Sequence, residues 1–310
     1  MLGVLWDPIF MKHDTGGHPE GPQRLEAVRK ALEKLPLEKR LGLTPRLATL
    51  QELALVHEEN YIHFVQERIE SGAQRLDVET PVSLHSFDAA SMAVGGSIDG
   101  LNDLLDGKMD QAFFAVRPPG HHAEADKAYG FCLFNNVAVG ARHLIVNRGV
   151  SKVAIFDFDV HHGNGTQNAF YEDPSVFYAS VHQWPLFPGS GMPGELGNGM
   201  ARGTTLNMPY PAGAGNNEYR EATLRFADEM DWFKPDVLLI SAGFDAHWAD
   251  FLAGHEMDED GYEEIARLVK QIADTFCQGK VGVYLEGGYN EKALEKSSRR
   301  FLETLIADND

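Results

Sequence analysis

The chain has 310 residues, of which 43% are hydrophobic, and its 46 acidic residues outnumber the 27 basic ones to give a formal net charge of −19. This length and apolar content allow a large buried core, and we expect a single domain over residues 1–310. The acidic balance argues against direct binding of nucleic acid, which needs a basic patch. It would attract cationic molecules, although an acidic surface that serves only solubility explains the same numbers.

Two features of the sequence indicate where the protein works. Its cysteines, Cys132 and Cys277, are too few for a disulfide framework, so reduced thiols in the cytoplasm are the default. Residues 2–6 are apolar, but Asp7 interrupts them and no basic segment or long apolar run follows. We therefore expect a cytoplasmic protein with neither a signal peptide nor a membrane span.

Strands and helices are expected to alternate along the chain. The apolar runs typical of buried strands are residues 2–6, 111–116, 152–158, 175–181, 236–241 and 280–285. Helical spacing of apolar residues occurs at 25–35, 61–69 and 262–276. This alternation predicts an α/β fold with a mostly parallel sheet and helices on both of its faces.

Two further segments are assigned more coarsely. Pro45 and residues 47–56 suggest a short strand and a helix that lead into His57, which we interpret as structural. Residues 184–215 are rich in glycine and proline, and they predict one long loop at the functional end of the sheet.

The first polar loop after a strand contains adjacent histidines. Residues 117–123 follow the apolar strand at 112–116, and two prolines and a glycine stiffen the loop before His121 and His122. Adjacent imidazoles on such a loop suit proton transfer near neutral pH. A pair of surface histidines in a turn explains this segment equally well when it is taken alone.

The next strand runs directly into carboxylates and imidazoles. Residues 153–156 are apolar, and Asp157, Asp159 and His161 follow at alternate positions. Burying several such groups is tolerable mainly when a cation or a hydrogen-bonded network neutralises them. Strand alternation would place all three on one face if the chain stays extended. Asp159 and His161 are therefore candidate ligands of one divalent cation.

A third ligand is expected after the strand at 237–240. Asp245 follows that strand at its carboxyl end, which is where open α/β sheets gather ligands. Helix capping is the alternative for Asp159 and for Asp245. Capping explains Asp245 taken alone, but it does not explain two carboxylates and two histidines within residues 157–162.

The last strand, near residues 281–285, leads into Glu286, two glycines and Tyr289. The glycines allow backbone geometries that other residues resist. A phenol presented there could donate a hydrogen bond to a developing oxyanion. A tyrosine after two glycines is more often an ordinary turn residue. A functional role for Tyr289 is therefore indicated only in combination with the other loops.

Together these loops resemble the zinc-dependent histone deacetylase family, which includes bacterial deacetylase-like amidohydrolases and acetylpolyamine amidohydrolases. The resemblance spans almost the whole chain. It implies a single-domain arginase-deacetylase fold with a mostly parallel eight-stranded sheet, two strands more than the apolar runs indicate. The matching segments are residues 18–25, 117–123, 157–167, 180–182, 241–247 and 285–290.

The resemblance implies two cations. Asp159, His161 and Asp245 match the ligands of a catalytic Zn²⁺, although iron(II) or cobalt would fit the same oxygen and nitrogen atoms. A structural K⁺ is implied as well. The residues that match its site are Asp157, Asp159, His161, Ser180 and Val181.

The resemblance also implies the catalytic groups. His121 and His122 match the tandem catalytic histidines, and Tyr289 matches the phenol that polarises the scissile carbonyl. Asp157 matches the carboxylate that holds His121, and Asn164 matches the partner of His122.

Asn164 stands where many relatives have aspartate, and together with Glu286 it resembles the class II branch. A neutral amide can orient an imidazole but cannot favour its protonated form as an anion would. His122 is therefore the expected general base, and a histidine would later protonate the departing amine.

Residues of a substrate channel are implied too. Phe131 and Phe187 match two aromatic rings that would sandwich an acyl-lysine or an acylated diamine, and plain core packing is their alternative. Leu252 matches the channel gate, where polyamine-selective relatives of this branch carry glutamate, so leucine favours acyl-lysine. Arg24 matches a residue that lines an internal exit path, and a salt bridge on a helix surface is its alternative.

The sequence therefore predicts a metal-dependent amidohydrolase that removes acetyl or similar groups from the lysine side chains of peptides or proteins. Acetylated polyamines are the alternative substrates. An arginase-like enzyme with two manganese ions is a third hypothesis, for which residues 159–163 lack the last acid of an Asp-x-His-x-Asp pattern. A catalytically silent protein that binds a small molecule or a partner is the fourth. The oligomeric state and the acyl chain length stay open.

Overall fold

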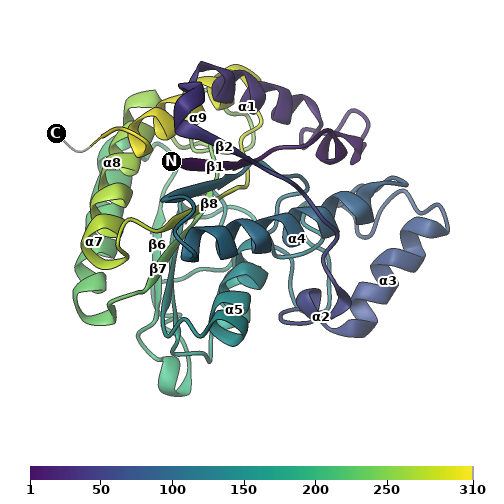
Figure 1. Cartoon of the computed structure of the whole chain (residues 1–310), viewed down its shortest axis with the longest axis horizontal. Helices are drawn as coiled ribbons and strands as arrows, with labels where there is room; N and C mark the ends of the chain where they lie inside the picture. Colours follow the sequence, from purple (N-terminus) through teal and green to yellow (C-terminus); the bar gives the residue numbers. More distant parts are fainter. Residues whose placement is uncertain (309–310) are drawn as a thin grey trace.

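The computed structural model describes residues 1–308. Its sheet has eight strands in the order β2-β1-β3-β8-β7-β4-β5-β6 (Figure 1). All neighbouring strands are parallel, so their carboxyl ends lie at one edge, and the expected eight-stranded sheet is confirmed. The strands are β1 (Leu2–Leu5), β2 (Arg40–Leu43), β3 (Gln111–Phe114), β4 (Val153–Asp157), β5 (Val176–Gln183), β6 (Thr205–Tyr210), β7 (Val237–Ala242) and β8 (Val281–Leu285).

Helices cover both faces of this sheet. One face carries a layer of helices in mutual contact, namely α1 (Gln23–Lys34), α7 (Asn216–Phe233), α8 (Glu259–Phe276) and α9 (Glu291–Leu305). The other face carries α4 (Ser86–Leu105) and α5 (Asn136–Arg148), with α6 (Asn164–Phe170) beside α5. The short α2 (Leu50–Leu53) and α3 (Glu59–Glu70) lie beyond α4 at the edge of the molecule (Figure 1). No helix within residues 1–308 is both long and apolar enough to cross a membrane.

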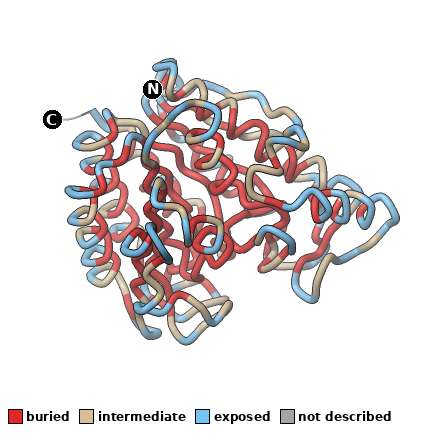
Figure 2. Tube along the Cα trace, turned by 90° about the horizontal axis from the view of Figure 1, so that it is seen from below, coloured by how far each residue is buried: buried red, intermediate tan, exposed pale blue. Residues whose placement is uncertain are grey.

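The central strands are mostly apolar because helices cover both of their faces. Every residue of β3, β4, β7 and β8 is buried. Figure 2 shows the buried residues concentrated in the sheet and on the inward sides of the helices. Burial of one aliphatic side chain contributes about 1.5–3 kcal/mol. This core therefore holds the carboxyl ends of the strands in fixed positions.

Two assignments made from the sequence are wrong. The strand near Pro45 lies instead at Arg40–Leu43, and residues 184–215 include β6 rather than forming one loop. These two strands form the edges of the sheet. Edge strands are covered less than central ones, and β2 exposes its two middle residues, so neither has the long apolar run that marks a central strand. The other six strands begin and end within two residues of the apolar runs that predict them, and β4 ends at Asp157.

Candidate active site

Four neighbouring strands bring the polar loops to one edge of the sheet. β3, β8, β7 and β4 are adjacent, and each is followed by one of the loops that the sequence singles out. The chain leaves β4 after Asp157, so a turn, and not an extended strand, places Asp159 and His161. Segments far apart in the sequence therefore meet where parallel sheets gather ligands.

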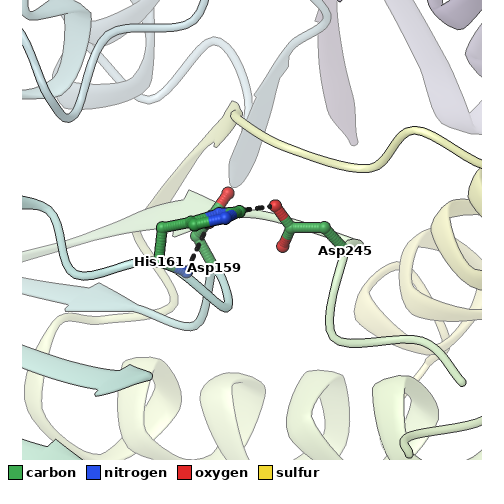
Figure 3. Close-up of side chains that lie close together, drawn as sticks. All are labelled: Asp159, His161 and Asp245. Atoms are coloured by element: carbon green, nitrogen blue, oxygen red, sulfur yellow. Dashed lines mark hydrogen bonds and ion pairs between the residues drawn. The ribbon is translucent and has the colours of Figure 1, made fainter. Parts of the chain in front are cut away.

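Asp159, His161 and Asp245 point toward one another in Figure 3. One ligand atom of each lies within 4.8 Å of the others. His161 Nδ1 is 3.1 Å from Asp159 Oδ1 and 3.2 Å from Asp245 Oδ2. All three residues are buried. Two carboxylates and one imidazole are a ligand set that a zinc-type ion accepts, with a position left for a ligand from outside the protein.

Backbone amides fix the two carboxylates. Asp159 Oδ2 accepts a hydrogen bond from the Gly287 amide at 2.7 Å, and Asp245 Oδ1 accepts one from the Val160 amide at 3.0 Å. A β-carbon on Gly287 would collide with both carboxylates, and one on Gly243 would collide with Asp159. These two glycines therefore serve close approach, which is why larger residues do not fit there.

The electrostatics of this cluster suit a cation. Burial by itself would lower the pKa of His161, but the carboxylates of Asp159 and Asp245 outweigh it and raise this pKa to about 10. Burial and repulsion from Asp159 raise the pKa of Asp245 to about 7. Neither acid caps a helix, because the residues at the N-caps of α6 and α8 are Gly163 and Asp258. The capping alternative is therefore wrong for both.

His121 has a carboxylate behind it. Its Nδ1 lies 3.0 Å from Asp157 Oδ2, which also accepts a hydrogen bond from the Tyr178 hydroxyl at 3.1 Å. Burial by itself would lower the pKa of His121, but Asp157 and Asp159 outweigh it and raise this pKa to about 10. A cationic imidazole can donate a proton or stabilise a negative charge close to it.

His122 has an amide behind it. Its Nδ1 lies 2.8 Å from Asn164 Oδ1. Asn164 Nδ2 donates to Glu124 Oε1 at 2.7 Å and to the His122 carbonyl at 3.3 Å, so the amide oxygen faces the ring. The ring therefore carries its proton on Nδ1 and keeps Nε2 as an acceptor. Burial and repulsion from His121 and His161 hold the pKa of His122 well below its usual range.

Glu124 is a residue that the sequence did not reveal. Its side chain is 22% exposed and also pairs with Lys127 at 3.3 Å. The expectation of a purely neutral partner for His122 is therefore incomplete, because an anion stands behind the amide of Asn164. Nothing in the local sequence pattern marks Glu124, since its contact with Asn164 arises only when two loops meet.

Glu286 connects the loop of His121 and His122 (residues 117–123) with its own loop, which carries Tyr289 (residues 285–290) and is called the tyrosine loop below. Its Oε2 accepts hydrogen bonds from the amides of Gly120 at 2.7 Å and His121 at 3.2 Å. Its Oε1 is buried and has no hydrogen-bond partner within the described part of the chain. Burial raises the pKa of Glu286 to about 7 against the attraction of His121. This acid therefore positions the loop that carries His121 and His122.

Arg24 holds the backbone of the tyrosine loop through hydrogen bonds. It is 1% exposed, so the alternative of a salt bridge on a helix surface is wrong. Its guanidinium donates to the carbonyl of Gly288 at 2.6 Å and to that of Glu286, and it lies 4.9 Å from the centre of the Tyr289 ring. Its ion pair with Glu20, at 3.0 Å, is also buried.

A pocket of about 180 Å³ opens beside these groups. It gathers the three expected channel residues with the expected base, ligand and phenol. Phe131 and Phe187 are both partly exposed, so the alternative of plain core packing is wrong. The lining residues are Glu79, His122, Gly130, Phe131, His161, Leu186, Phe187, Leu252 and Tyr289.

Two details fix the walls of this pocket. Phe131 has a backbone φ of +71°, a conformation that is rare outside glycine. Residues in such strained conformations cluster at functional sites. Asp250 accepts hydrogen bonds from the amide of Tyr289 at 2.7 Å and from that of Leu252 at 3.1 Å. One carboxylate, which sequence reasoning missed, therefore positions the backbone of both Tyr289 and Leu252.

The residues matched to a potassium site lie in the same region. Ser180 of β5 is opposite Asp157 of β4, and its hydroxyl lies 2.9 Å from His182 Nδ1. Val181 follows it and is fully buried. The structure therefore brings Ser180 and Asp157 together, and the ion itself stays a prediction.

Comparison with known proteins gives one consistent result. The histone deacetylase domain family matches residues 18–305. Histone deacetylase 10, chloroplastic, of Oryza sativa subsp. japonica is 37% identical over 306 residues, which cover 93% of this chain and 69% of the relative. A probable deacetylase of Archaeoglobus fulgidus is 35% identical over 295 residues, which cover 94% and 82%. The crystal structure of the HDA15 HD domain aligns with a TM-score of 0.92 at 33% identity over 98% of this chain and 88% of that one.

Proposed function

The chain belongs to the histone deacetylase family and is a hydrolase of amide bonds, and from this premise we propose that it removes acyl groups from lysine side chains with the help of a zinc ion. One observation carries the proposal. The cluster of Asp159, His161 and Asp245 adjoins a pocket that His122 and Tyr289 also line. The fold is the arginase-deacetylase fold that the resemblance implied.

Asp159, His161 and Asp245 would hold the metal ion. Two buried carboxylates whose charges a single histidine does not match are a donor set that fits a divalent cation. When bound, a zinc-type ion supplies a Lewis acid that polarises an amide carbonyl and makes water more acidic. Within residues 1–308 one cluster of this kind is found, which favours one ion over the pair of an arginase-like enzyme.

The side chains around the pocket divide the remaining work. His122 presents Nε2 as a general base that takes a proton from the attacking water, because Asn164 occupies its Nδ1. Tyr289 donates a hydrogen bond to the carbonyl oxygen as negative charge develops on it. His121, which its carboxylate neighbours keep protonated, delivers a proton to the leaving amine. An amine and a carboxylate are the products.

The shape of the pocket supports a linear acyl-lysine. Phe131 and Phe187 offer aromatic faces to a chain of methylene groups, and Leu252 is apolar at the gate. Acetylated polyamines are the second candidate, because the carboxylate of Glu79 at the same pocket could pair with a distal ammonium group. We also propose a structural K⁺ near Asp157 and Ser180, a cytoplasmic location and no direct binding of nucleic acid.

A deacylation panel tests the proposal. Metal-free protein is reconstituted with Zn²⁺, Fe²⁺ or Co²⁺ and assayed for release of free amine from acetyl-lysine peptides, longer acyl-lysine peptides and N-acetylputrescine. We expect the highest kcat/KM on an acyl-lysine peptide and loss of turnover when a chelator is added. A higher kcat/KM on N-acetylputrescine would assign the polyamine function instead. Metal-loaded protein that leaves every acylated amine intact would contradict both assignments and support a silent binding protein.

A further inference from the structure

A second and larger cavity adjoins the pocket of about 180 Å³ described above, which we call the acyl pocket. Its volume is about 610 Å³, and it lies between α3 and two segments at residues 76–79 and 126–129. Phe187 and Glu79 line both cavities, so the two lie side by side. Cavities of this size commonly hold organic ligands. We call it the side groove.

The floor of the side groove is apolar and open to solvent. Tyr61, Phe64, Leu76 and Val78 line it, and of these Tyr61 is buried, with an exposed fraction of 4%. Phe64 is 45% exposed and Val78 is 85% exposed. A gathering of exposed apolar side chains inside a hollow is typical of a binding surface. α3 lies at the edge of the molecule, where such a surface is accessible (Figures 1 and 2).

The rim of the side groove is acidic. Asp77, Glu79 and Asp126 face one basic residue, Lys127. The ammonium group of Lys127 is already engaged, because it lies 3.3 Å from Glu124 and 5.0 Å from the centre of the Tyr129 ring.

The carboxylate of Asp77 is also engaged, since it accepts hydrogen bonds from the amides of Glu79 and Thr80 in its own loop. Glu79 and Asp126 are exposed. Their two carboxylates can therefore receive a cation from solution.

Phe187 is the wall between the side groove and the acyl pocket. On the pocket side its ring lies 5.1 Å from that of His122, and on the groove side 4.8 Å from that of Tyr129. A molecule that fills the side groove would therefore pack against the same ring that confines the acyl chain. One substrate that spans both cavities satisfies this geometry.

We propose that the side groove binds the part of a peptide that flanks an acyl-lysine, with an apolar side chain on Tyr61 and Phe64 and a cationic side chain at Glu79 and Asp126. This inference rests on the proposed function and narrows its substrate to peptides and proteins. An acetylated polyamine carries cations but no apolar branch, so it leaves the floor uncovered. Burial of one such branch is worth about tenfold or more in affinity.

Kinetics with matched peptides test the assignment. Two acetyl-lysine peptides carry Leu and Arg, one on the amino side of the acetyl-lysine and the other on its carboxyl side. Each has a counterpart with Gly and Asp at the same positions. Capped acetyl-lysine serves as the substrate without flanking residues. We expect one Leu/Arg peptide to exceed its Gly/Asp counterpart by about tenfold in kcat/KM, mainly through KM. Equal kcat/KM for all the peptides would overturn the proposal.

Variants locate the effect. In the double variant Phe64→Ser/Asp126→Asn, the Leu/Arg preference should disappear while kcat/KM on capped acetyl-lysine and on N-acetylputrescine stays unchanged. The control variant Val146→Ser/Asp228→Asn, which alters an apolar and an acidic residue exposed on α5 and α7, should keep the preference. An equal loss on a longer acetylated polyamine such as N-acetylspermidine would assign the side groove to polyamines and refute the peptide assignment.

An equilibrium measurement separates this inference from the proposed function. Fluorescence anisotropy with the labelled Leu/Arg peptide should give a Kd about tenfold weaker for Phe64→Ser/Asp126→Asn than for the wild type. If no peptide is deacylated but this difference in Kd persists, the proposed chemistry fails and the side groove stands. If peptides are deacylated and the two Kd values agree, the chemistry stands and the side groove assignment fails.

Discussion

The two adjacent histidines have ring centres 4.0 Å apart, yet their surroundings shift their pKa values in opposite directions. Carboxylates raise the pKa of His121 against the effect of burial, whereas burial and its cationic neighbours lower that of His122. Pairs of titratable groups that are separated in this way are how a site assigns acid and base roles. At the residue scale, the charges and the burial around each imidazole therefore set the protonation state on which its proposed role depends.

The first prediction concerns the base and the phenol. His122→Ala and Tyr289→Phe should each lower kcat by about 10²- to 10³-fold, because one loses the proton acceptor and the other a hydrogen-bond donor to the oxyanion. Both proteins should bind Zn²⁺ as the wild type does, which calorimetric titration measures. Turnover near the wild-type level in either metal-loaded variant would remove the role assigned to that residue.

The second prediction concerns Glu124, which orients Asn164. Glu124→Ala should lower kcat on the order of tenfold with little change in KM, because the Asn164 amide loses a charged acceptor. Asn164→Asp should lower kcat as well, since it places two carboxylates in contact.

Combining Glu124→Gln with Asn164→Asp should restore kcat, because the new amide can donate to the new acid. If Glu124 has a purely structural role, the losses of kcat caused by the two substitutions should instead add up in this double variant, which would contradict the prediction. Lys127→Ala serves as the control, since Lys127 contacts Glu124 but not Asn164.

At the scale of elements, burial decided what the sequence could reveal. β4, β7 and β8 are covered on both faces, so their apolar runs and the polar loops after them could be read directly. β2 and β6 lie at the edges and lack such runs. The candidate ligands could be found because they follow central strands. Glu124 and Asp250 could not, because their roles come from contacts between loops that no local pattern encodes.

The third prediction concerns His57, which the sequence suggested is structural. It is buried, its Nδ1 lies 2.9 Å from the Glu124 carbonyl, and its Nε2 accepts from the Asn135 amide at 2.9 Å. His57→Phe should therefore lower the free energy of unfolding at pH 7 by about 1–3 kcal/mol, because both backbone groups lose their partner. Urea unfolding measures this, with the exposed His63→Phe as the control.

The same residue predicts a pH dependence. Burial lowers the pKa of His57 to about 4, so below its ordinary pKa the unfolded chain binds a proton that the folded chain does not. The stability that neutral His57 contributes is present above pH 6.5 and is lost as the pH falls toward 4. The deficit of His57→Phe should therefore shrink by roughly 1–2 kcal/mol between pH 7 and pH 5. A deficit that stays constant would show that His57 is not buried as a neutral ring.

At the scale of the whole molecule, metal binding should couple to folding. An ion that binds only the folded state stabilises it by about 2.7 kcal/mol at a hundred times its Kd, which corresponds to several degrees in Tm. Zn²⁺ should therefore raise the Tm of the wild type but not that of Asp245→Asn. The metal-free variant should unfold at no lower temperature than the metal-free wild type, because it loses one of two neighbouring buried acids. A Zn²⁺ shift of equal size in both proteins would contradict the assigned ligand.

The net charge of −19 predicts a dependence on ionic strength. If the acidic surface steers substrates, kcat/KM on a cationic acetyl-lysine peptide should fall as NaCl rises, since salt screens the attraction. A neutral capped acetyl-lysine should show no such fall. Parallel salt curves for the two substrates would leave solubility as the role of the surface.

Asp159 is tied to the amide of Gly287, two positions before Tyr289. The proposed metal ligand Asp159 and the phenol of Tyr289 are therefore linked through one short segment of backbone. An ion of larger radius that spreads the two carboxylates would also carry the phenol outward. Exchange of the ion should for this reason alter the ranking of acyl chain lengths as well as the overall rate.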